Sequence, residues 1–68
     1  MGKNLNALKR IKKNHQYEKI DGMIVDGQTA NVVLSTDNAL SGERKKKYRQ
    51  IIEKDLIKAV DIAWKVHS

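Results

Sequence analysis

The side chains best suited to catalysis are few and far apart in this sequence. The chain has two histidines, His15 and His67, and no cysteine. An activated nucleophile needs a base within reach and a third group that orients the base. Neither histidine has a neighbouring thiol to activate, and each lies toward the end of a predicted element. We therefore expect two surface histidines and a protein that is not an enzyme.

The acidic residues and glycines also lack the spacing of a ligand site. Zinc needs three or four ligands at matched intervals, and Asp21, Asp26 and Asp37 do not follow the pattern of a calcium loop. Gly22 and Gly27 each follow an aspartate, which is typical of turns rather than of a phosphate-binding loop. We expect no metal, no cofactor and no cavity that buries a substrate.

Charge is the strongest chemical signal in the chain. Fourteen basic and eight acidic residues give a net charge of +6, and no basic residue occurs between Ile20 and Glu43. This segregation predicts distinct faces, of which only some suit an anionic partner. The candidate anion-binding residues form two runs, namely Lys9, Arg10, Lys12 and Lys13, and then Arg44, Lys45, Lys46, Lys47 and Arg49. The alternative interpretation is a solvated helix face that binds nothing.

The second basic run lies in a stretch with helical periodicity. Ser41 is a candidate N-cap, and Glu43 would meet the helix dipole in the first turn. Asp55 interrupts the pattern and can cap a second helix. We predict two helices, 43–52 and 55–66, with one continuous helix as the alternative. The apolar stripe runs through Tyr48, Ile51, Ile52, Leu56, Ile57, Val60, Ala63, Trp64 and His67, and both Ile51/Ile52 and Ile57/Trp64 are expected to be buried.

The first half of the chain predicts a helix followed by a hairpin. Asn4 can cap a basic amphipathic helix that ends near Asn14 and buries Leu5, Leu8 and Ile11. Asp21-Gly22 favours a two-residue type I′ turn, so residues 17–26 are predicted to form a short hairpin that rests on a helix.

The segment that follows the hairpin permits two interpretations. As a helix over 28–38, it would be capped by Asp26 or Thr29, with Ala30, Val33, Leu34 and Leu40 along one side. Asn31, Ser35 and Asp37 would then lie on its far side. As a strand, the β-branched residues near Val33 would pair back across Asp26-Gly27. We choose the helix.

These elements predict a mainly α fold with a small α+β component. We expect one compact domain over 1–68, built from three to four helices and one short β-hairpin. No apolar run approaches the roughly 20 residues of a membrane span, and no secretory signal is evident. A chain this short buries a small core, so a partner or self-association as a homo-oligomer would add burial.

Three short motifs carry a resemblance. VDGQTANVVL, NAL and VDIAWK resemble a group of small uncharacterised proteins encoded by bacteriophages and other mobile elements, over about residues 20–66. The resemblance implies a setting in the cytoplasm of a bacterial host. It implies no activity and no site residues.

Two functional hypotheses remain open. In the first, the chain is an interaction module that docks its basic and apolar helix faces onto a host protein with an acidic surface. In the second, helices 28–38 and 43–52 form a helix-turn-helix that brings Lys45, Lys46 and Arg49 to nucleic acid. The long turn between them counts against the second. Trp64 is predicted to anchor the core, and it becomes a binding hot spot if it is exposed instead.

Overall fold

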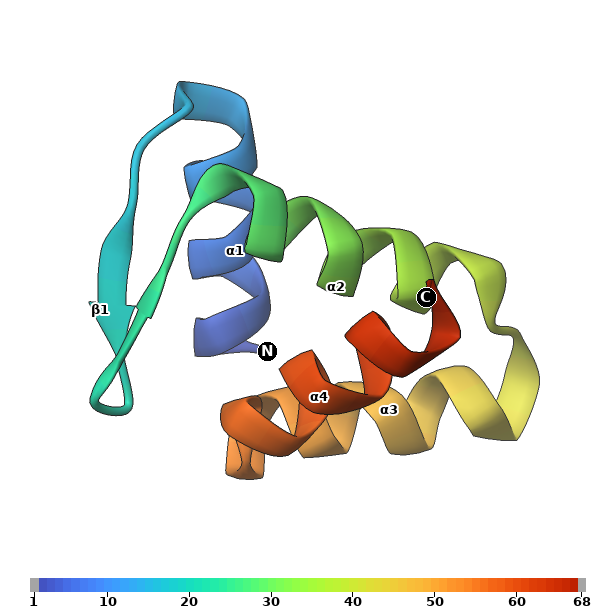
Figure 1. The fold of residues 1–68 in the computed structure, drawn as a ribbon. Coiled ribbons are helices and arrows are strands. Elements are labelled where there is room, and N and C mark those ends of the chain that lie inside the picture. Colours follow the sequence, from blue (N-terminus) through green and yellow to red (C-terminus); the bar gives the residue numbers. More distant parts are fainter. Residues whose placement is uncertain (1, 68) are drawn as a thin grey trace.

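The computed structural model describes residues 2–67 as a mainly helical fold with one short β-hairpin (Figure 1). In Figure 1, α2 and α3 cross the molecule in opposite directions, and α4 lies between them. The hairpin lies beside α1, at the left of this view. In chain order the elements are α1 (Lys3–Asn14), β1 (Glu18–Ile20), β2 (Met23–Val25), α2 (Gly27–Ala39), α3 (Gly42–Lys54) and α4 (Leu56–Val66). The predicted fold class is confirmed.

The N-terminal helix begins earlier than the sequence suggested. Asn4 lies inside α1 and is buried, and the N-cap position is Gly2. The predicted Asn4 cap is therefore wrong. A carboxylate from α3 supplies the acceptors that this helix start needs, which leaves the Asn4 side chain available for other contacts.

The hairpin forms as the Asp-Gly pair predicts. Strands β1 and β2 are antiparallel, with Ile20 opposite Met23. Asp21 and Gly22 have φ of 52° and 81°, the positive values that a type I′ turn requires. Ile20 and Val25 are buried, so the hairpin contributes one apolar face to the core.

Segment 27–39 is a helix, and the strand alternative is wrong. The Asp26 side chain accepts a hydrogen bond of 2.8 Å from the Thr29 N–H, which holds the pKa of Asp26 below its usual value. This cap fixes the start of α2 directly after the second strand, and Ala30 and Val33 are fully buried.

The C-terminal stretch breaks into two helices where predicted. Asp55 ends α3 and caps α4, because its side chain accepts a hydrogen bond of 3.2 Å from the Lys58 N–H. At the start of α3, Ser41 occupies the cap position without a side-chain cap bond, and Gly42 has a φ of 59°. That left-handed conformation favours glycine and turns the first residue of α3 away from regular helix geometry.

The core differs from the prediction mainly along α4. Ile57 and Trp64 are 58% and 40% exposed, so their predicted burial is wrong. Ala59 and Ala63 are buried in their place, because small side chains let α4 sit close against its neighbours. The largest fully buried side chains are Leu8, Ile11, Val25, Val33, Ile52 and Leu56. No helix among residues 2–67 combines the length and apolar character that a membrane crossing requires.

Candidate anion-binding groove

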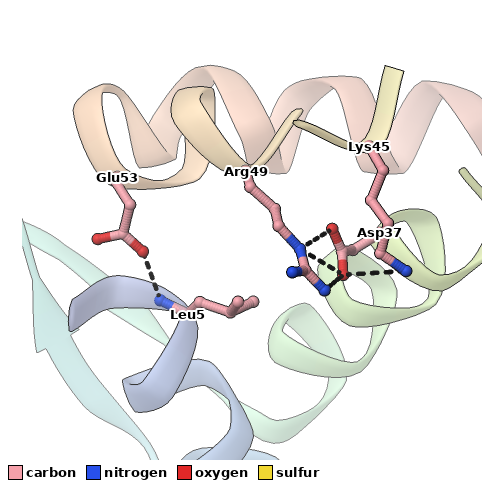
Figure 2. Close-up of polar contacts among 5 residues, drawn as sticks. All are labelled: Leu5, Asp37, Lys45, Arg49 and Glu53. Atoms are coloured by element: carbon pink, nitrogen blue, oxygen red, sulfur yellow. Dashed lines mark hydrogen bonds and ion pairs between the residues drawn. The ribbon is translucent and has the colours of Figure 1, made fainter. Parts of the chain in front are cut away.

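The start of α1 is held against the end of α3 by one carboxylate. Glu53 accepts hydrogen bonds of 2.9 Å from the backbone N–H groups of both Asn4 and Leu5, and Figure 2 shows the bond to Leu5. The first N–H groups of a helix have no partner within the helix and carry a partial positive charge. Glu53 thus supplies from a distant part of the sequence what a local cap usually provides.

Asn4 completes this junction from the other side. Its side-chain amide donates to the carbonyl of Ile52 at 2.9 Å and to the carboxylate of Asp21 at 3.1 Å. One buried side chain therefore ties α1 to the last turn of α3 and to the hairpin turn. Because these contacts fix where α1 and α3 meet, they also set the space between the two helices.

A hollow of about 620 Å³ lies between α1 and α3. Most of its exposed inner surface belongs to carbon atoms, since long lysine and arginine side chains with apolar stems form much of its wall. Nothing in the sequence predicts a concavity of this size in so short a chain. Its lining residues are Gly2, Leu5, Asn6, Lys9, Gly42, Lys45, Lys46, Arg49, Gln50, Glu53 and Lys54.

A second hollow of about 410 Å³ adjoins the first. Lys9 and Arg49 line both hollows, so the two lie next to each other, and together we call them the basic groove. The second hollow adds Lys12 and Lys13 from α1 and Leu34, Asp37 and Asn38 from α2.

The basic groove concentrates nearly all the net charge of the chain. Among residues 2–67, seven cationic and two anionic side chains line it. The groove therefore carries five of the six net positive charges. Clustered charge beside low-dielectric walls focuses the electrostatic field and attracts oppositely charged partners.

Asp37 lies under the groove and holds two of its cations. The carboxylate is buried and accepts hydrogen bonds from Arg49 at 3.0 Å (Nε) and 3.1 Å (Nη2), and Lys45 Nζ lies 4.0 Å away (Figure 2). The hydrogen bonds to Asp37 raise the pKa of Arg49. The expectation that Asp37 faces away from the core is therefore wrong. A bidentate pair of this kind fixes the guanidinium in one orientation.

The nine predicted anion-binding residues divide into two groups. Six lie in the groove, namely Lys9, Lys12, Lys13, Lys45, Lys46 and Arg49. Arg10, Arg44 and Lys47 line neither hollow. Arg10 instead pairs with Glu18 at 2.8 Å, and its hydrogen bonds lower the pKa of Glu18.

Three charged residues of the groove were not predicted as site residues from the sequence. Lys54 follows Lys46 by eight positions, so helical periodicity places both on one face and would have identified it. Glu53 follows Lys45 and Arg49 at four-residue steps, but its role depends on a contact with residues almost fifty positions earlier. Asp37 lies seven positions before the second basic run, and no local signal shows that it is buried.

The histidines do not join the groove. His15 ends α1 in a left-handed conformation, and His67 Nε2 lies 3.2 Å from the Thr36 hydroxyl. Within the described part of the chain, no three His, Cys, Asp or Glu side chains are grouped so that they could hold a metal ion. The groove itself combines cationic side chains with carbon-lined space, which suits contact with anions and apolar groups.

Comparisons with protein-family models, with curated proteins and with solved structures found no match to this chain.

Proposed function

We propose that this protein acts by non-catalytic binding and that the basic groove receives an acidic surface of a partner protein. The observation that carries the proposal is the convergence of two basic runs, one on α1 and one on α3, around a single concavity. Cations spread evenly over the surface would be enough for solubility. Cations gathered around a hollow favour recognition.

The chemistry of the groove favours a protein partner over nucleic acid. Its inner surface is mostly carbon, which suits apolar side chains better than a phosphate backbone. The helix-turn-helix interpretation brings Arg49 to nucleic acid, but Arg49 already donates through Nε and one Nη to Asp37. A helix-turn-helix function remains the alternative.

The biological setting comes from the resemblance to phage and mobile-element proteins alone. In that setting, the partner would be a host protein in the bacterial cytoplasm, and binding would block or redirect it. Self-association of the chain is compatible with this role and would be visible by light scattering.

The test exploits two adjacent lysines on α3. Lys46 and Lys47 are both exposed, but only Lys46 lines the groove. Lys46→Glu and Lys47→Glu change the net charge equally. Any difference in probe binding between the two variants therefore reflects whether the altered residue lies in the groove. The probes are fluorescein-labelled polyglutamate and a random DNA duplex, titrated by anisotropy at about 50 and 200 mM salt, where screening differs.

We expect polyglutamate to bind the unaltered protein, and Lys46→Glu to weaken that binding at least about fivefold more than Lys47→Glu. Equal weakening by the two variants would show a diffuse charge effect and overturn the proposal. A difference confined to DNA would overturn it in favour of the nucleic-acid alternative.

A further inference from the structure

The basic groove has an apolar part and a cationic part. We infer that its occupant is a short peptide segment that carries both an apolar side chain and carboxylates. One apolar side chain of the segment enters the larger hollow, and neighbouring carboxylates lie along Lys9 and Arg49 toward Lys12 and Lys13. This inference rests on the proposed function and specifies the element of the partner that is bound.

The apolar part follows from the larger hollow. Its volume of about 620 Å³ falls within the range of small-ligand sites, roughly 300–1,000 Å³. Leu5 contributes an apolar side chain to the lining, and Gly2 and Gly42 bring no side chain into the space. A Cβ atom at Gly42 would meet nothing within 4 Å, so this side of the hollow is open. Carbon-lined space of this kind is desolvated favourably by an apolar side chain.

The acidic part follows from the groups that remain available. Among residues 2–67, Lys9, Lys12, Lys13, Lys46 and Lys54 have no carboxylate within ion-pair distance. Both carboxylates of the groove are engaged, because Glu53 accepts from the start of α1 and Asp37 from Arg49. They therefore leave the lysines free to meet charges on a partner.

The order of the two parts follows from the way the hollows join. Lys9 and Arg49 belong to both, so a chain that leaves the larger hollow passes these two cations before it reaches Lys12 and Lys13. Arg49 donates hydrogen bonds from Nε and Nη2 to Asp37, and its side chain is 46% exposed. The remaining Nη1 donors are those a peptide carboxylate would use.

The experiment compares synthetic peptides that differ in one property. The first has one leucine flanked on each side by three glutamates. The second replaces the leucine with serine, and the third keeps the leucine but replaces the glutamates with lysines. We expect the first to bind about tenfold more tightly than the second, because a filled apolar pocket contributes about that factor. The third should not bind.

A variant that fills the hollow assigns the effect to this site. Asn6 is exposed and lines the larger hollow, so Asn6→Trp should remove the advantage of leucine over serine. Asn14→Trp is the matched control, because Asn14 is exposed on the same helix and lines neither hollow. Circular dichroism confirms that both variants fold.

The outcomes separate the inference from the proposed function. Equal binding of the leucine and serine peptides would overturn the inference and leave an acidic partner in place. The same holds if polyglutamate binds and neither glutamate peptide does. Failure of polyglutamate and of both glutamate peptides would overturn the proposed function as well.

Discussion

Helix α3 makes two contacts that differ in kind. Against α4 it is closed, because Tyr48 and Ile52 are buried and the Tyr48 hydroxyl donates to the Ala59 carbonyl at 2.7 Å. Against α1 it is joined at one end by Glu53 and Asn4, and a hollow remains beyond that junction. The same helix therefore packs on one side and holds a groove open on the other.

The difference shows what separates a structural contact from a binding surface. On the α4 side, the small buried side chains of Ala59 and Ala63 let the helix backbones approach. On the α1 side, lysine and arginine side chains from both helices line the hollow between them. The hydrogen bonds of Glu53 and Asn4 join α1 to one end of α3, and the hollow between the two helices stays accessible.

The largest effect is expected where the closed contact is broken. Ile52 is fully buried, and Ile52→Ala should lower the free energy of unfolding by about 2–5 kcal/mol through lost burial and the cavity that remains. In so short a chain this loss is a large part of the total stability. Urea unfolding followed by circular dichroism measures it.

Ile57→Ala is the matched control for this prediction. The Ile57 side chain is 58% exposed, so its truncation should change the unfolding free energy by less than about 1 kcal/mol. Losses of similar size in the two variants would mean that Ile57 is buried and that the sequence-based assignment of this residue was right.

Local chemistry made much of the fold predictable. The Asp21-Gly22 turn and the caps at Asp26 and Asp55 each depend on residues within three positions, and these predictions are confirmed. Two helices at the C-terminus followed directly from the Asp55 cap. Lys45 and Arg49 are four positions apart, so helical periodicity puts them on one side of α3, where both meet Asp37.

The errors occur where distant segments decide the outcome. Helix α4 has apolar residues around most of its circumference, so its own pattern does not choose between Ala59 and Trp64 for the core. The choice depends on α2 and α3, the two helices that α4 packs against. The groove itself could not be predicted for the same reason, because it depends on Glu53 reaching Asn4 and Leu5.

A smaller effect is expected from breaking the open contact. Glu53→Ala removes the acceptor for two backbone N–H groups, and loss of a helix cap costs about 1 kcal/mol. Amide hydrogen exchange at Asn4 and Leu5 should become faster than in the unaltered protein, since their bonds form in the folded state only. Gln50→Ala, at an exposed position of α3, should leave both amides protected. Unchanged exchange in Glu53→Ala would show that the junction does not depend on this carboxylate.

An effect of similar size at neutral pH concerns the hydroxyl that joins α3 to α4. Tyr48→Phe removes one buried hydrogen bond and should cost about 1 kcal/mol. Burial raises the pKa of Tyr48 from 10.0 to about 12, so the folded protein retains this proton more strongly than the unfolded chain does. The stabilisation that this group provides is complete below pH 10 and is lost as the pH rises toward 12. Unfolding measured across that range should show a steeper loss in the unaltered protein than in Tyr48→Phe. Tyr17→Phe should keep the steep loss, because Tyr17 is 69% exposed. Identical alkaline profiles for the unaltered protein and Tyr48→Phe would mean that the closed contact does not hold this hydroxyl.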